Sequence, residues 1–552
     1  MAIRNAILRS SSPFIGSLVA LAFAAGCQPP PSGDDDDLTG GAGGTSGAGG
    51  TQVGANTGGA KGGTTGALAG ASTGGAATGG TGSSVGGGVS AGGATASGGA
   101  GVSAGGGAGL GAGGAIAAGG TGAVSGGAGL GAGGAIAAGG SAGMSTGGAA
   151  GSGAGGSGPV GTTDWYNPDF KEFVGEDCTV AEPADVNDPK LPDLFKNLDG
   201  TRMSAKAQWA CRRAEIKAVV EKYIHGPKPG KPDMVTGTVS KSSVSVKVTV
   251  GSNSVEFSVP VSIPSNAKMP APAIIGLGGG SLDKAIVSEE GVATMNYSNN
   301  TISAESDRTG LFSKLYPNTG ASAQVGWAWG VSRIIDVLVA EKAAGRNDII
   351  DPTAIGVTGC SRLGKGAFTI GAFDERIALG IPQESGTGGV SAFRIVNTNP
   401  MGPNGKPAQS LNSAWTEAQG WFGTAFNTYK GKVNVIPGDT HSLVAMYAPR
   451  GLLVLDNSRI GELGSVAQHG ATAAGAMVYK ALGAEKNVAY HGGRPMDPHN
   501  HCSFYPEQAD ALKRAIRAHL TRTAEPDGRM EPQPVATANI SEWVEWVAPT
   551  LE

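Results

Sequence analysis

Polar and apolar residues alternate over residues 236–263, around the turn-forming segment GSNS at residues 251–254. This period of two predicts antiparallel strands joined by a hairpin, because successive side chains of a strand point to opposite faces. The pattern then changes to short apolar runs separated by longer segments with helical spacing. We expect buried strands in residues 271–280, 291–298, 354–359, 376–383 and 451–457, and helices in residues 326–345, 470–483 and 507–520.

Strands that alternate with helices predict a mainly parallel sheet whose two faces are both covered by helices. We therefore expect an α/β fold, a three-layer sandwich with an antiparallel hairpin at its N-terminal side. The functional groups of such a sheet gather at the carboxyl ends of its strands. Candidate chemistry is thus expected in the loops that follow the predicted strands.

The N-terminal part of the chain has a different composition. Residues 28–163 are dominated by Gly, Ala, Ser and Thr, and the segment GGAGLGAGGAIAAGG occurs twice, at residues 106–120 and 126–140. So few aromatic and branched side chains cannot offset the entropy lost on folding. We predict a flexible tether, which leaves residues 164–552 as the folded domain.

Residues 1–27 have an arginine-containing start, an apolar stretch and then small residues, which is typical of a secretory signal. The ending LAFAAGC resembles a bacterial lipobox, in which the cysteine, here Cys27, becomes the lipidated N-terminus. This resemblance predicts an exported lipoprotein, held at the bacterial outer membrane or cell surface or released from it. An ordinary signal peptide that contains Cys27 is the alternative.

Charge and cysteine content narrow the classes of function. The formal net charge is −4 and no segment is rich in Lys or Arg, which argues against nucleic acid as a partner. Apart from Cys27 the chain has four cysteines, Cys178, Cys211, Cys360 and Cys502. An even number in an exported chain suggests two disulfides, with three possible pairings. None lies in a C-x-x-C pair, so a metal site is the weaker interpretation.

The segment AIGVTGCSRLGKGAF, residues 354–368, leads from a predicted strand through a bend into a helix-compatible stretch. That order is typical of a nucleophile elbow, in which a serine hydroxyl projects above the sheet. Gly359 lies two residues before Ser361, but Leu363 stands where the motif has its second glycine, which follows as Gly364. A serine in an ordinary tight turn is the alternative.

A serine nucleophile needs a base, and in α/β-hydrolases the catalytic histidine comes last in chain order. His499 and His501, in DPHNHCSFYP, lie just before the last predicted helix. A His-x-His metal pair is the alternative, but nothing nearby completes a ligand set. Because Cys360 precedes Ser361 and Cys502 follows His501, a bridge between these cysteines would bring Ser361 near His501.

Three segments, GCSRLGKGA, RIALGIPQESGTGG and HNHCSFYP, occur in an order that resembles the glucuronoyl esterases of carbohydrate esterase family fifteen. The resemblance covers nearly all of the folded domain. It implies an α/β-hydrolase fold, a disulfide between Cys360 and Cys502, and Cys178–Cys211 as the other pair. It also implies hydrolysis of the ester between lignin alcohols and the 4-O-methyl-glucuronoyl groups of glucuronoxylan, through an acyl-enzyme. We expect no metal or organic cofactor, and a monomer.

The resemblance also implies roles for individual residues. Ser361 matches the family's nucleophile, His501 its base, and Glu384, in PQESG, the acid that orients the histidine. Asp456 and Glu462, in LDNSRIGELG, remain competitors for the acid. Arg362 matches the family's oxyanion-stabilising arginine, with an ordinary surface ion pair or helix cap as the alternative.

Sugar recognition is implied for Lys365, Gln409 and Glu417, whose positions match family residues that contact the uronate ring. The sequence departs from the family where a tryptophan often touches a ring hydroxyl, because Glu462 occupies that position. Two rival functions are an acetyl or feruloyl esterase with the same triad, and a non-enzymatic surface protein in which the tether displays a carbohydrate-binding module.

Overall fold

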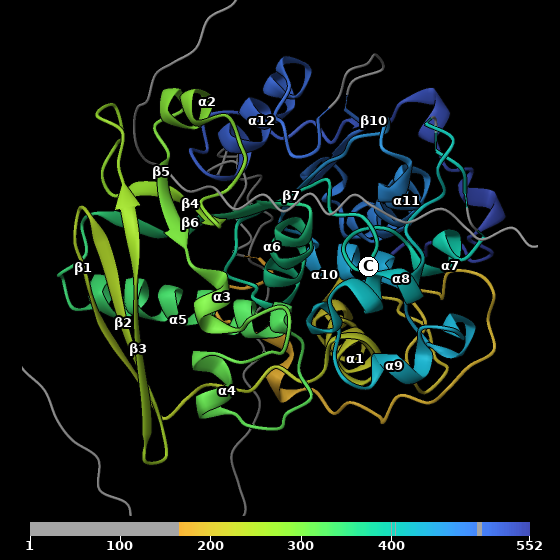
Figure 1. Cartoon of the computed structure of the whole chain (residues 1–552), viewed down its shortest axis with the longest axis horizontal. Helices are drawn as coiled ribbons and strands as arrows, with labels where there is room; N and C mark the ends of the chain where they lie inside the picture. Colours follow the sequence, from red (N-terminus) through yellow and green to blue (C-terminus); the bar gives the residue numbers. More distant parts are fainter. Residues whose placement is uncertain (1–164, 399, 403, 494–499) are drawn as a thin grey trace, which may run out of the picture. The chain divides into compact units, whose positions relative to one another are not determined.

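A ten-stranded sheet forms the centre of the folded domain (Figure 1). The computed structural model describes residues 165–552, except residues 399, 403 and 494–499. Its strands are β1 (Met234–Val239), β2 (Ser243–Val250), β3 (Asn253–Ser262), β4 (Ala271–Leu277), β5 (Ala293–Tyr297), β6 (Ile350–Cys360), β7 (Leu379–Gln383), β8 (Gly451–Leu455), β9 (Val488–His491) and β10 (Met530–Glu531). Cys27, the glycine-rich segment and His499 lie outside the described residues, so the expectations for them stay predictions.

The spatial order of the strands is β1-β2-β3-β5-β4-β6-β7-β8-β9-β10. Strands β1, β2 and β3 pair antiparallel, and β3 also meets β5 antiparallel. From β5 to β10 every pairing is parallel. The predicted parallel sheet is confirmed, and the predicted hairpin is part of a three-stranded antiparallel extension.

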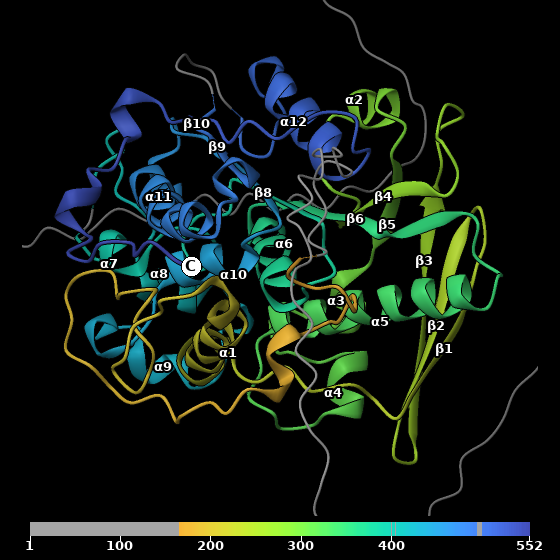
Figure 2. The ribbon, with the colours of Figure 1, turned by 180° about the vertical axis from the view of Figure 1, so that it is seen from behind.

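Helices cover both faces of the sheet, which gives the expected three layers (Figures 1 and 2). They are α1 (Trp209–Val220), α2 (Lys284–Glu289), α3 (Asn299–Ile302), α4 (Leu311–Leu315), α5 (Ala323–Ala343), α6 (Arg362–Phe373), α7 (Phe393–Val396), α8 (Leu411–Glu417), α9 (Phe426–Tyr429), α10 (Thr440–Tyr447), α11 (Ser465–Leu482) and α12 (Pro506–His519). Helices α5 and α6 pack together on one face, and α2 and α12 on the other (Figure 1). No helix within the described ranges combines the length and the hydropathy that a membrane span requires.

Each face of the sheet has its own apolar core. Neighbouring residues of β4 show the division, because Ile275 belongs to the large core that contains α5 and Ile274 to the smaller core that contains α12. Both isoleucines are almost fully buried. Strands buried on both faces explain why the sequence shows continuous apolar runs here rather than alternation.

The long predicted elements match the structure closely. The helix expected at residues 326–345 is α5, and those expected at residues 470–483 and 507–520 are α11 and α12. Strands β9 and β10 were not predicted, because four and two residues carry too little periodic signal. Both exist through pairing with their neighbours, β9 with β8 and β10 with β9.

Candidate active site

Ser361 occupies the bend between β6 and α6, with φ +57° and ψ −125°. Its N–H donates to Gln383 O at 3.0 Å, and its own carbonyl accepts from Lys365 N at 3.0 Å. A Cβ at Gly359 would lie 2.5 Å from Leu363 O, and one at Gly364 would lie 2.4 Å from Gln383 O. The close backbone approach therefore falls at residue 364, which explains why the second glycine of the motif is displaced by one residue. The strand, bend and helix predicted around Ser361 are all present.

Glu384 and His501 form a hydrogen-bonded pair beside this bend. Glu384 follows β7 and is completely buried, and its Oε2 lies 2.6 Å from His501 Nδ1. The same carboxylate oxygen accepts the backbone N–H of Cys502 at 2.9 Å. A carboxylate on Nδ1 orients the imidazole and leaves Nε2 to act as an acceptor. This is the arrangement that a general base requires.

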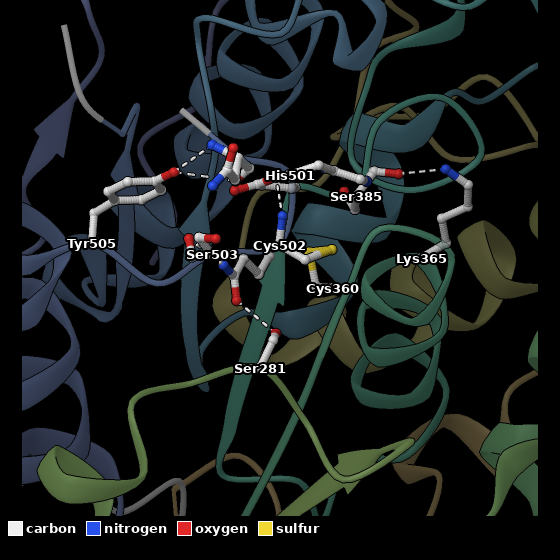
Figure 3. The surroundings of a disulfide bond; sticks show 11 residues. Ser281, Cys360, Lys365, Ser385, His501, Cys502, Ser503 and Tyr505 are labelled. Atoms are coloured by element: carbon white, nitrogen blue, oxygen red, sulfur yellow. Dashed lines mark hydrogen bonds and ion pairs between the residues drawn. A yellow bond between two sulfur atoms is a disulfide. The ribbon is translucent and has the colours of Figure 1, made fainter. Parts of the chain in front are cut away.

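A disulfide between Cys360 and Cys502 joins the residue before Ser361 to the residue after His501, with the two Cα atoms 5.6 Å apart (Figure 3). Ser361 directly follows Cys360 and His501 directly precedes Cys502, so both lie next to the bridge at the carboxyl edge of the sheet. The Ser361 hydroxyl has no hydrogen-bond partner among the described residues, so no direct bond to His501 is formed in this state. The second disulfide joins Cys178 to Cys211 of α1, with the Cα atoms 5.4 Å apart.

The loop that carries His501 is held by further hydrogen bonds. Asn500 N–H donates to the phenol oxygen of Tyr505 at 2.5 Å, and that hydroxyl donates back to Asn500 O at 3.2 Å (Figure 3). Below the disulfide, Ser281 Oγ donates to Gln383 Oε1 at 2.7 Å, and Gln383 Nε2 donates to Ser503 O at 3.3 Å. These contacts connect the loop after β9 to the ends of β4 and β7.

The two competing acids lie elsewhere. Asp456, directly after β8, is completely buried and accepts hydrogen bonds from Gln468 Nε2 and from Tyr490 OH, the latter at 2.5 Å. Burial raises the pKa of Asp456 to about 6, even though the hydrogen bond from Tyr490 opposes the change. Glu462 pairs with Lys406 Nζ at 2.7 Å. Of the three carboxylates, the structure thus brings Glu384 to His501.

Arg362 begins α6, and its guanidinium is half exposed. Nη1 lies 3.0 Å from Glu305 Oε1, and Nη2 lies 3.5 Å from Glu417 Oε1. Glu305 also accepts a hydrogen bond from Trp421 Nε1 at 2.8 Å. The guanidinium is therefore oriented by two carboxylates, which is the ion-pair alternative considered for this residue. An oxyanion-stabilising role stays a prediction.

Lys365 lies one turn further along α6 and is buried. Its Nζ donates to Ser385 O at 2.6 Å and lies 4.6 Å from the centre of the Trp421 ring. The pKa of Lys365 is lowered to about 8, mainly by burial and also by the neighbouring Arg362, while Glu417 and Glu305 oppose the shift. A cation over an indole face with few protein partners is suited to bind a hydroxyl oxygen of a ligand.

The remaining predicted sugar contacts lie close to this group. Gln409 Nε2 donates to Glu417 Oε2 at 2.5 Å, which joins Gln409 to the carboxylate beside Arg362. Gln409 N–H donates to the backbone oxygen of Glu462 at 2.9 Å. The Glu462 carboxylate itself is engaged by Lys406 and by Asn404 Nδ2 at 3.0 Å. The structure thus gathers Arg362, Lys365, Gln409 and Glu417, and places Glu462 at their margin.

Two residues of this group were missed by the sequence analysis. Trp421 lies in the short helix η4 (Gln419–Trp421), and Glu305 lies in the loop that follows α3. The only signal for Glu305 was its place after a predicted parallel strand, because that strand ends at the same edge as β6. Nothing in the pattern around Trp421 distinguishes it from a core tryptophan.

Comparison with known proteins gives a consistent family. The family described as "Glucuronyl esterase, fungi" matches residues 246–483. The 4-O-methyl-glucuronoyl methylesterase of Thermothelomyces thermophilus is 40% identical over 384 residues, which cover 68% of this chain and 92% of that protein. The protein of the same name from Hypocrea jecorina is 38% identical over 367 residues, covering 66% and 76%.

Solved structures agree with these sequence matches. A mutant glucuronoyl esterase from Sporotrichum thermophile, in complex with methyl 4-O-methyl-β-D-glucopyranuronate, is 39% identical and superposes with a TM-score of 0.61, covering 68% of this chain and 100% of that one. A carbohydrate esterase family 15 glucuronoyl esterase from Caldicellulosiruptor kristjansonii is 26% identical, with a TM-score of 0.56, and covers 65% and 97%. The chain therefore belongs to the glucuronoyl esterase family and is a carboxylic ester hydrolase with an α/β-hydrolase fold.

Proposed function

We propose that Ser361, His501 and Glu384 are the catalytic triad and that hydrolysis proceeds through an acyl-enzyme. The observation that carries the proposal is the 2.6 Å contact between His501 Nδ1 and the buried Glu384, on a loop that a disulfide attaches beside Ser361. His501 Nε2 takes the Ser361 proton as the hydroxyl attacks the ester carbonyl, and then gives it to the departing alcohol. Water, activated in the same way, releases the acid.

Arg362 is the proposed source of oxyanion stabilisation. In many α/β-hydrolases the loop after the strand beside the nucleophile strand supplies one N–H donor. Here that loop follows β4, and the N–H groups of Gly278, Gly279 and Gly280 already donate within the fold, to Tyr297 O, Gly276 O and Leu277 O. The backbone N–H of Arg362 has no such partner among the described residues, and its guanidinium is held by Glu305 and Glu417. A single donor of this kind contributes about 3–4 kcal/mol to transition-state stabilisation.

The proposed substrate is an ester of 4-O-methyl-glucuronic acid with a lignin alcohol, as it occurs on glucuronoxylan. The methyl ester of the same uronic acid is the ligand bound to the Sporotrichum thermophile glucuronoyl esterase. Lys365, Gln409 and Glu417 together offer the donors and acceptors that several sugar hydroxyls require. A polar cluster of this kind would be unsuited to an acetyl group, which has no hydroxyl to bind.

A panel of esters tests the assignment. Wild-type protein should hydrolyse benzyl glucuronate with a kcat/KM far above that for acetylated xylan or methyl ferulate, and Ser361→Ala should lose roughly 10⁴-fold or more in kcat. Circular dichroism of the mutant controls for folding. A preference for acetyl or feruloyl esters would favour the rival esterase. If the protein hydrolyses neither class of ester but still binds xylan, the result would favour a carbohydrate-binding module.

We further infer that the protein is exported and that Cys27 becomes a lipidated N-terminus, with residues 28–163 as the tether. The lipobox-like ending LAFAAGC and the composition of the following segment support this inference. The curated relatives compared above are fungal, so they carry no support for a bacterial lipoprotein. Mass spectrometry of the mature N-terminus decides the matter: a diacylglyceryl cysteine at residue 27 is expected, and an unmodified start elsewhere would contradict it.

A further inference from the structure

A cavity of about 250 Å³ lies at the carboxyl ends of β4, β5 and β6 and has no part in the triad or the sugar contacts. Its walls include Gly276 of β4, Gly279 and Gly280 of the glycine-rich loop that follows β4 (residues 278–280), Asn296 of β5 and Thr358 of β6. The loop closes tightly over the strand end, because a Cβ at Gly276 would lie 2.8 Å from the backbone of residues 279 and 280. The cavity is thus a formed feature of the sheet edge rather than a gap between loose side chains.

The cavity adjoins the nucleophile. Thr358 lies on β6, three residues before Ser361 at the bend, so their Cα atoms are at most roughly 10 Å apart at about 3.3 Å per residue. The glycine-rich loop touches both segments, since a Cβ at Gly280 would lie 3.1 Å from Thr358 Cγ2 and one at Gly278 would lie 2.8 Å from Leu363 Cδ1. The alcohol group of an ester that is bound at Ser361 can therefore extend past this loop.

The cavity and the sugar contacts lie on opposite sides of the sheet edge. Lys365 belongs to α6, and Trp421 lies in η4, which packs against α5 on the same face. The apolar wall of the cavity is formed by Leu282 and Val287, which belong to the core shared with α12 on the other face (Figure 1). An ester carries its acyl and alcohol halves on opposite sides of the carbonyl carbon. If the uronate lies against Lys365, the alcohol half extends towards the cavity.

The lining indicates which alcohols fit. Ile274, Leu282 and Val287 give an apolar surface suited to an aromatic ring. Around them stand four polar side chains that have no hydrogen bond or ion pair to other described residues: Ser262, Thr294, Asn296 and Lys284. Hydroxyl, amide and ammonium donors beside an apolar wall match a ring that carries hydroxyl or methoxy oxygens.

We propose that this cavity binds the alcohol half of the ester and selects aryl-alkyl alcohols with oxygen substituents. This inference rests on the proposed function, and it adds a specificity site to it. A methyl ester would leave the cavity empty and lose the binding energy that the ring supplies. The site would act on selection between esters and not on the chemistry at Ser361.

Two filling substitutions test the site. Asn296→Trp and Lys284→Trp both place an indole at exposed positions of the lining. Each should lower kcat/KM for benzyl glucuronate at least 5-fold while changing kcat/KM for methyl glucuronate less than 2-fold. Benzyl alcohol should also inhibit the wild type competitively and both variants weakly. Ser288→Trp, at an exposed position of α2 outside the cavity, is the matched control and should change neither ester.

The outcomes separate this inference from the proposed function. If the wild type hydrolyses neither glucuronate ester, the proposed function itself fails. If it hydrolyses both and the two filling variants lose both to the same extent, or neither, the cavity does not bind the alcohol and the esterase assignment stands. Thermal melting identifies a variant that fails to fold, and the other filling variant then decides.

Discussion

Three residues of the site have positive φ although none is glycine: Ser361 at +57°, Glu384 at +46° and Cys502 at +64°. Such a backbone costs of order 1–3 kcal/mol per residue and persists only where the surroundings fix it. The N–H of Ser361 donates to Gln383 O, that of Glu384 to Leu455 O, and that of Cys502 to the Glu384 carboxylate. Each strained residue is thus anchored by a hydrogen bond to another part of the site, which keeps nucleophile, acid and histidine loop in one arrangement.

Lys365 should make substrate affinity depend on pH. Because burial lowers its pKa to about 8, the ammonium is charged below pH 8 and neutral above it. We expect KM for benzyl glucuronate to rise from pH 7 to pH 9.5, and Lys365→Met to raise KM about 10-fold at pH 7 and to remove the pH dependence. Initial rates after subtraction of spontaneous hydrolysis give both values. A wild-type KM that is constant over this range would contradict a charged Lys365 in binding.

The contribution of Lys365 to stability changes with pH in the opposite direction from its contribution to substrate affinity, so the two effects can be separated. The folded protein binds fewer protons at Lys365 than the unfolded chain between pH 8 and the ordinary lysine pKa, since the folded pKa is lowered. Linkage then makes the contribution of this residue to the free energy of unfolding rise with pH in that window. A rise in KM above pH 8 therefore cannot be attributed to unfolding driven by Lys365, and thermal melting at each pH provides the control.

Two adjacent strands each present a buried carboxylate, and only their contacts distinguish the roles. Glu384 follows β7 and reaches His501, whereas Asp456 follows β8 and is engaged by Gln468 and Tyr490. Glu384→Gln should lower kcat about 10³–10⁴-fold, because the amide no longer favours the catalytic tautomer of the histidine. Asp456→Asn is the matched carboxyl-to-amide control and should lower kcat less than about 10-fold. A larger loss of kcat in Asp456→Asn would show that Asp456, after β8, is the acid of the triad.

The disulfide between Cys360 and Cys502 connects β6 to the loop before α12 across 142 residues of sequence. Replacing both cysteines by serine should lower kcat at least ~10-fold, because His501 loses the link that holds its loop beside Ser361. The same double replacement at Cys178 and Cys211 removes a link near α1. It should lower the melting temperature, because a native disulfide contributes about 2–5 kcal/mol to the free energy of unfolding. It should leave kcat unchanged. Equal losses of kcat in both double variants would contradict a positioning role for the first bridge.

Local signals explain which elements were predictable. The strand, bend and helix around Ser361 are contiguous in sequence, so periodicity and two glycines were sufficient to predict them. Strand β10, with two residues, exists only through its neighbour β9 and has no signal of its own. The distinction between Glu384 and Asp456 depends on where the fold places His501, which lies 117 residues after Glu384 in the sequence. Likewise, Trp421 and Glu305 meet Arg362 only through the tertiary fold.

At the scale of the chain, the two ends of the described domain bind each other. Lys206 N–H donates to Glu552 O at 3.0 Å, and Glu552 N–H donates to Ser204 O at 3.0 Å. Trp546 Nε1 donates to Leu191 O at 2.8 Å. The segment after α12 therefore binds the segment before α1, and these contacts join the two ends of the described domain.

Removal of residues 1–163 should consequently leave the esterase intact. We expect the fragment 164–552 to hydrolyse benzyl glucuronate with kcat and KM within 2-fold of the full chain, and to melt within a few degrees of it. A second fragment, 164–539, is the matched control, because it keeps the triad but loses the contacts of Trp546 and Glu552. Its melting temperature should fall by several degrees, since each of these hydrogen bonds contributes about 1 kcal/mol and the packing of Trp546 is also lost. If the first fragment instead loses activity while remaining folded, the glycine-rich segment takes part in catalysis or substrate binding, and the division into tether and catalytic domain is wrong.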